Sequence, residues 1–138
     1  MKVFSNDFFK LVVLACSFAT VSCRQSQKND TASVGDGIMF LDSIHDFGQI
    51  PLESPVDSFD FRFVNMSGQA VVVLAARTSC ECTKAVFPKR PVLAGDSSYV
   101  RVIYDGTGRR PEFFNKSVIV TTSASFEDVI LEISGELK

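Results

Sequence analysis

The most constraining feature of the sequence is an alternation of aromatic and charged residues, which reads Phe59-Asp60-Phe61-Arg62-Phe63. Successive side chains of a β-strand point to opposite faces, so a strand would place the three rings on one face and the two charges on the other. The run therefore predicts a β-strand that has one face in an apolar core and one face in water.

Other segments also have the composition of strands. The segments Tyr99 to Tyr104, Ser117 to Thr121 and Asp128 to Ser134 alternate less strictly, but they are rich in Val and Ile. Half-buried strands typically have this composition. The segment Ala70 to Ala76 is continuously apolar, which predicts a strand that is buried on both faces.

Turn-forming residues separate these segments at short and regular intervals, as in an all-β sandwich. They occur at Asn65 to Gly68, Pro88 to Pro91, Ala94 to Asp96 and Asp105 to Gly108. Residues 38–138 show no sustained helical periodicity. We therefore expect residues 38–138 to form an all-β fold, a single immunoglobulin-like antiparallel β-sandwich of about seven strands. The chain has no Trp, so it lacks the hallmark of true antibody domains.

The N-terminus has the layout of a secretory signal. The cationic residues Lys2 and Lys10 precede an apolar run from Leu11 to Val21, and small residues lead to Cys23. The apolar run is too short to span a membrane stably. The sequence predicts that residues 1–22 are a signal peptide that is removed.

The stretch Thr20-Val21-Ser22-Cys23 resembles the signal of bacterial lipoproteins, in which the cysteine is acylated and becomes the new N-terminus. Two alternatives remain: acylation of Cys16, which would leave a short apolar core, and ordinary cleavage near Ser22. Residues 23–37 are polar and small, which predicts a flexible tether after the lipidated Cys23. The expected location is the cell envelope, with the domain lipid-anchored and facing the periplasm or the cell surface.

The charge balance argues against nucleic acid as a partner. The chain has a formal net charge of −2, whereas nucleic-acid-binding modules normally carry a basic excess. The basic pairs Lys89-Arg90 and Arg109-Arg110 lie beside prolines in expected turns. We interpret both pairs as solvated loop tips.

Several motifs occur in an order that resembles an uncharacterised bacterial family, the domain of unknown function numbered fifteen seventy-three. The motifs are His45-Asp46-Phe47-Gly48-Gln49-Ile50, Phe61-Arg62-Phe63-Val64-Asn65, Ser79-Cys80-Glu81-Cys82-Thr83, Pro91-Val92-Leu93-Ala94-Gly95-Asp96 and Leu131-Glu132-Ile133-Ser134-Gly135. The resemblance implies a short Ig-like domain, often carried on lipoproteins, in the broad group that includes major sperm protein and chaperone-type Ig domains. It implies no settled activity.

This chain departs from the family pattern at two positions. Glu81 stands where the family usually has Gly between its two cysteines, and Ala94 stands where it usually has Pro. An ionised carboxylate close to the two thiols would raise their pKa.

Cys80 and Cys82 are the candidate metal or redox residues, and their spacing leaves three alternatives open. They form a structural or inert pair, a reversible disulfide, or a pair of soft thiolates that binds copper(I). On a regular strand their Cα atoms would lie near the upper limit for a disulfide, so a bridge would need a bulge or a turn.

The other potential metal ligands are sparse. A structural zinc site normally has four ligands, and the only His of the chain is His45. Its expected role is an ordinary surface or loop contact. Met39 and Met66 could add thioether ligands, but single methionines in a β-domain usually fill the core.

The sequence does not predict an enzyme. With one His and no nucleophile-elbow pattern, it offers no converging set of catalytic groups. We expect a binding or scaffolding module that contacts an envelope protein or glycan through its edge strands and contacts the membrane only through its lipid. The alternative function is a thiol site at Cys80 and Cys82 that binds copper or cycles a disulfide.

Overall fold

The computed structural model describes residues 34, 35, 37–125 and 127–138. The predicted signal peptide, Cys16 and Cys23 lie outside the described residues. Val34 and Gly35, near the end of the predicted tether, pair with the next strand and form β1. None of the described residues forms a helix that is long and apolar enough to cross a membrane.

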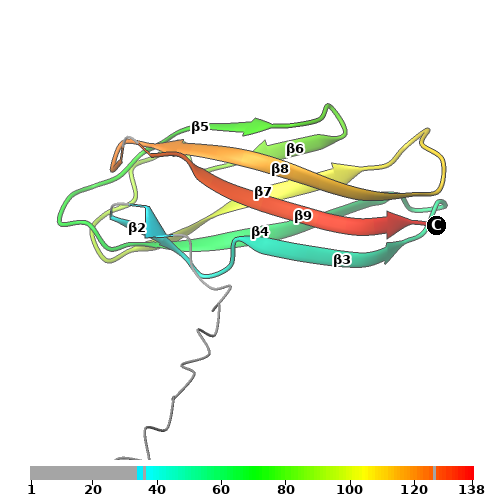
Figure 1. Cartoon of the computed structure of the whole chain (residues 1–138). Coiled ribbons are helices and arrows are strands. Elements are labelled where there is room, and N and C mark those ends of the chain that lie inside the picture. The colour runs from blue at the N-terminus through cyan, green and yellow to red at the C-terminus, as the bar shows by residue number, and fades with distance from the viewer. Residues whose placement is uncertain (1–33, 36, 126) are drawn as a thin grey trace, which may run out of the picture.

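The described residues form nine strands in two sheets that pack face to face (Figure 1). The five-stranded sheet has the order β1-β2-β4-β7-β6, and the four-stranded sheet has the order β3-β9-β8-β5. The strands are β1 (Val34–Gly35), β2 (Ile38–Phe40), β3 (Ile44–Ile50), β4 (Val56–Asn65), β5 (Val73–Thr78), β6 (Thr83–Val86), β7 (Ser97–Asp105), β8 (Glu112–Thr122) and β9 (Val129–Leu137). The predicted all-β sandwich is confirmed.

One strand pair differs from the antiparallel arrangement that the sequence predicts, because β3 pairs with β9 in parallel. The chain changes sheets between β2 and β3. The Leu41 N–H still donates to the Arg62 carbonyl in the five-stranded sheet, whereas the Ser43 carbonyl accepts from the Glu132 N–H in the four-stranded sheet. β3, the first strand of the four-stranded sheet in chain order, therefore runs parallel to β9, the last strand of the domain.

The alternating run lies in β4 and points as predicted. Phe61 and Phe63 have no exposed surface, and both belong to a core that the two sheets share. Phe59 is only partly buried, and its ring stacks on His45 with centroids 3.7 Å apart. On the opposite face, Asp60 pairs with Arg101 of β7 at 2.6 Å. The guanidinium of Arg101 holds the pKa of Asp60 below its usual value.

The prediction that Ala70 to Ala76 is buried on both faces is wrong. The strand here is β5, at the edge of the four-stranded sheet, and Leu74 is 60% exposed. Val71 lies before β5 and pairs with Val92 in an isolated bridge. An apolar run does not reveal whether a strand is central or at an edge, because that depends on which other strands pair with it.

Candidate functional site

The two cysteines of the C-x-C motif lie in the loop that connects β5 with β6, where the chain passes from the four-stranded to the five-stranded sheet. The structure joins Cys80 and Cys82 in a disulfide whose Cα atoms are 5.2 Å apart. This separation lies within the usual range for disulfides. A turn produces it, because the Thr83 N–H donates to the Cys80 carbonyl at 3.0 Å.

The two sulfur atoms have different surroundings. Cys80 Sγ accepts hydrogen bonds from the Cys82 backbone N–H at 3.2 Å and from Arg109 Nη2 at 3.4 Å. Cys82 Sγ contacts only the Thr83 hydroxyl among the described polar atoms, at 3.7 Å. Cys82 is 8% exposed, whereas Cys80 is half-buried. The cysteine whose sulfur is better supplied with donors is therefore also the less buried residue of the two.

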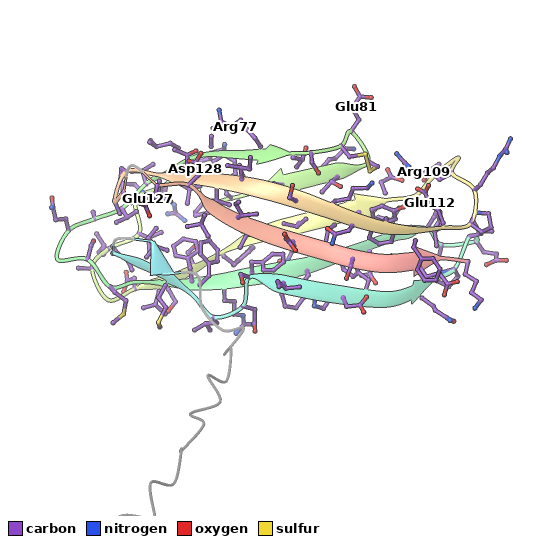
Figure 2. The ribbon with its side chains drawn as sticks, in the orientation of Figure 1. Arg77, Glu81, Arg109, Glu112, Glu127 and Asp128 are labelled. Carbon is purple, nitrogen blue, oxygen red and sulfur yellow. A yellow bond between two sulfur atoms is a disulfide. The ribbon has the colours of Figure 1, made fainter. Side chains whose placement is uncertain are left out.

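Arg109 comes from the loop between β7 and β8, and it also pairs with Glu112 at the start of β8. Arg109 Nη1 donates to Glu112 Oε1 at 2.7 Å. Figure 2 shows both side chains beside the yellow bond of the disulfide, whereas Glu81 points away into solvent. The carboxylate that the sequence places between the two cysteines therefore extends away from the sulfurs.

Tyr104 of β7 is fully buried close to this site. Its ring stacks on Phe114 with centroids 3.8 Å apart, and its hydroxyl has no hydrogen-bond partner among the described residues. Burial raises the pKa of Tyr104, and the negative charge of Glu112 raises it further. The phenol therefore stays neutral at physiological pH.

An open pocket of about 270 Å³ adjoins the disulfide. Asp105 is on its wall, and hydrogen bonds from Thr107 hold the pKa of Asp105 below its usual value. The full lining is Glu81, Cys82, Lys84, Asp105, Thr107 and Arg109. Residues of both charge signs line the pocket beside Cys82, and this arrangement suits a polar protein surface better than a small apolar ligand.

The structure does not bring the other potential ligands to the cysteines. His45 is on β3, at the end of the four-stranded sheet opposite β5, and its ring contacts Phe47 and Phe59. Met39 is half-buried on β2, and Met66 is exposed after β4. In the part of the chain that the structure describes, no three His, Cys, Asp or Glu side chains gather in a way that could hold a metal ion.

The comparison with family models agrees with the order of motifs in the sequence. The model described as "Protein of unknown function (DUF1573)" matches residues 38–137. The chain belongs to the DUF1573 family. The match spans strands β2 to β9 and includes the Cys80–Cys82 turn. A search of curated proteins finds none with significant similarity to this DUF1573 protein.

Solved structures share the fold of the DUF1573 domain at low sequence identity. A protein of unknown function from Porphyromonas gingivalis W83 is 12% identical with a TM-score of 0.61, over 76% of this chain and 50% of that chain. The Vibrio cholerae VesB protease is 17% identical with a TM-score of 0.54, over 73% and 32% of the two chains. The PapD-like domain 7 of human CEP192 is 10% identical with a TM-score of 0.51, over 75% of this chain and 87% of that chain. This DUF1573 chain therefore spans half of the P. gingivalis protein and a third of VesB, and the likeness shows a shared Ig-like sandwich.

Sequence reasoning missed Arg109 and Glu112 as parts of the site. The pair Arg109-Arg110 reads as a solvated loop tip, but only Arg110 is exposed, whereas Arg109 is half-buried against Cys80 and Glu112. Twenty-nine positions separate Arg109 from Cys80. The local sequence contains no signal for that contact, because it depends on how the two loops meet in the DUF1573 fold.

Proposed function

We propose that this DUF1573 domain is a non-catalytic binding module of the cell envelope, held to the membrane by acyl chains on Cys23 and facing the periplasm or the cell surface. The layout of residues 1–23 supports the anchor. The sandwich fold is compatible with a binding role, because sandwiches of this architecture include antibody variable domains, which bind through loops at one end.

The acyl anchor has a direct test. The intact mass of the protein extracted from its own membrane should exceed that of the chain from Cys23 onward by the mass of its acyl groups. Cys23→Ser should abolish this added mass and release the protein from the membrane, because acyl chains supply the hydrophobic attachment. Cys16→Ser is the matched control and should change neither. Acylation that persists in Cys23→Ser would refute the anchor at this residue.

The observation that carries the binding proposal is a group of exposed isoleucines on the outer face of the four-stranded sheet. Ile119 of β8 lies directly opposite Ile130 of β9. Ile44 of β3 lies opposite Glu132 of β9, which is two residues after Ile130 and therefore on the same face of the sheet. We name these three residues the isoleucine patch, and their exposed fractions lie between 36% and 58%. We interpret this group as an interaction surface, because neighbouring exposed apolar residues are more typical of binding sites than residues that are exposed singly.

The outer face suits a partner better than the edge strands do. Register shifts interrupt β3 between Asp46 and Gln49 and β5 between Val73 and Ala75. β6 has four residues, of which Lys84 is exposed. Bulges, short edges and lysines are features that hinder the addition of another strand. We therefore place the contact on the isoleucine patch.

The chemistry of the isoleucine patch favours a protein over a glycan. Its three aliphatic side chains can be buried against apolar groups, but they cannot hydrogen-bond the hydroxyls of a sugar. The proposed partner is therefore an envelope protein with an exposed apolar surface.

The test uses crosslinking of the full-length protein in its own envelope. The double variant Ile119→Ser and Ile130→Ser should weaken the crosslinked protein complex roughly tenfold, because two apolar side chains no longer become buried on binding. Val86→Ser on β6, an exposed aliphatic of the other sheet, is the matched control and should leave the complex intact. A complex that survives the double variant would overturn the proposal, as would binding of purified envelope polysaccharide in place of any protein.

The position of the C-x-C bridge favours a second function, a reversible disulfide. Cys80 and Cys82 close a turn between two strands, and Cys80 is partly exposed. Exposed disulfides are typically the labile and catalytic ones. Copper binding at the same two sulfurs would require the reduced pair.

A further inference from the structure

We propose that Cys80 is the reacting sulfur of this bridge, that Cys82 resolves the mixed disulfide formed on Cys80, and that Arg109 is a positioning residue that stabilises the Cys80 thiolate. The substrate class is an exposed disulfide or dithiol of another envelope protein. This inference rests on the reversible disulfide proposed above and assigns the roles of its residues.

The two sulfurs are unequally supplied with hydrogen-bond donors. The Cys82 backbone N–H and Arg109 Nη2 both point at Cys80 Sγ, at 3.2 and 3.4 Å. After reduction these donors would stabilise negative charge on Cys80, and the nearby guanidinium would add a favourable charge interaction. Cys82 Sγ has the Thr83 hydroxyl at 3.7 Å and no cation among its described contacts. The charge of the reduced pair therefore belongs on Cys80.

The two cysteines also differ in how far they are buried. Sulfur exchange requires the attacking sulfur and both sulfurs of the target to lie in line. Cys82 lines one side of the open pocket beside the bridge, but the residue is only 8% exposed, so it offers an incoming protein little room. Cys80 is half-buried and lies at the turn. Access and charge stabilisation thus select the same sulfur.

Glu112 tunes the effect of Arg109. Its carboxylate accepts from Arg109 Nη1 at 2.7 Å and so holds the guanidinium beside Cys80. Its negative charge also offsets part of the field that Arg109 exerts on the sulfur. Removing the charge of Arg109 and removing the charge of Glu112 should therefore have opposite effects on the redox equilibrium.

The exchange conserves atoms and electrons. The Cys80 thiolate attacks one sulfur of the partner disulfide and forms a mixed disulfide, and the other partner sulfur leaves with the electron pair of the broken bond. The Cys82 thiol gives its proton to solvent and attacks Cys80 Sγ, which forms the Cys80–Cys82 bond and expels the first partner sulfur as a thiolate. The domain is oxidised by two electrons, and the partner disulfide is reduced to two thiols. A partner dithiol drives the same steps in reverse.

The test for the reacting sulfur uses oxidised glutathione as the probe and the reduced protein isolated from its own envelope. Cys82→Ser leaves Cys80 as the free thiol of the motif, and Cys80→Ser leaves Cys82. We expect the mixed disulfide with glutathione to form roughly tenfold faster on Cys80 than on Cys82, with the site identified by peptide mass mapping.

The test for Arg109 is the equilibrium of the intact pair in buffers of set glutathione composition. Arg109→Gln should shift the equilibrium roughly fivefold toward the disulfide, because the reduced form loses the cation that stabilises its thiolate. Arg109→Lys keeps a cation and should therefore shift the equilibrium less than Arg109→Gln does. Glu112→Gln should shift the equilibrium in the opposite direction, toward the reduced pair. Arg110→Gln, at the exposed neighbouring arginine, is the matched control and should match the unchanged protein.

The outcomes separate the two proposals. Faster reaction at Cys82, or an Arg109→Gln variant that behaves like Arg110→Gln, would overturn the assignment of roles while leaving the reversible disulfide intact. A wild-type pair that neither equilibrates with glutathione nor forms a mixed disulfide in any variant would overturn the reversible disulfide itself, and the assignment with it.

Discussion

Replacing Phe61 by Ala is expected to lower the free energy of unfolding by about 3–5 kcal/mol, the usual cost of removing a buried aromatic ring. Phe61 has no exposed surface, and it lies on β4, between β2 and β7 in the five-stranded sheet. Its ring packs edge-on to Phe59 with centroids 5.0 Å apart. A domain of this size is typically stable by about 5–15 kcal/mol, so the loss would be a large share of its stability.

Urea-induced unfolding of the purified protein measures this effect. Phe113→Ala is the matched control, because Phe113 is 82% exposed and its loss should change the free energy of unfolding by less than about 0.5 kcal/mol. Equal destabilisation by the two substitutions would show that the buried face of β4 does not dominate the core.

Replacing Asn65 by Ala is expected to cost about 3 kcal/mol, although it removes a polar side chain. Asn65 is fully buried at the end of β4. Its amide nitrogen donates to the carbonyls of Gln69 and Val92 at 2.7 and 2.9 Å, and its amide oxygen accepts from the N–H and the hydroxyl of Ser67 at 2.9 and 2.7 Å. Ala would remove these four hydrogen bonds and leave the space of the amide empty at a buried position, and the partner groups would keep only their second hydrogen bonds, such as that from the Val71 N–H to the Val92 carbonyl.

Two further substitutions sharpen this prediction. Asn115→Ala removes an exposed amide from β8 and should have little effect on urea unfolding. Asn65→Asp keeps the acceptor but places a carboxylate against two carbonyl oxygens, so its neutral form is favoured in the folded state. Its destabilisation should therefore shrink as the pH falls toward the pKa of the buried carboxyl. A destabilisation of Asn65→Asp that does not depend on pH would contradict the proposed hydrogen-bond pattern.

Side-chain periodicity was sufficient to predict the faces of the central strands. The alternation from Phe59 to Phe63 predicts which rings enter the core, and Phe61 and Phe63 do so. The same reasoning failed for Ala70 to Ala76, because periodicity does not say which strands flank a segment. Leu74 is consequently exposed at a sheet edge.

The candidate site, too, could be predicted from the sequence only in part. The C-x-C spacing is visible in the sequence, and so is the need for a turn if the two cysteines are to bridge. The contact of Arg109 with Cys80 is not visible, because it joins two loops that are far apart along the chain. Which of the two sulfurs carries the negative charge after reduction depends on this contact.

Local chemistry thus accounts for the sandwich, its core residues and the position of the cysteine pair, since each follows from the backbone period and from neighbouring residues. The tertiary structure alone decided the parallel pairing of β3 with β9, the exposed isoleucine patch and the unequal surroundings of Cys80 and Cys82. These features arise where segments distant in the sequence come together, and the free energy of such contacts depends on the three-dimensional packing of the whole domain.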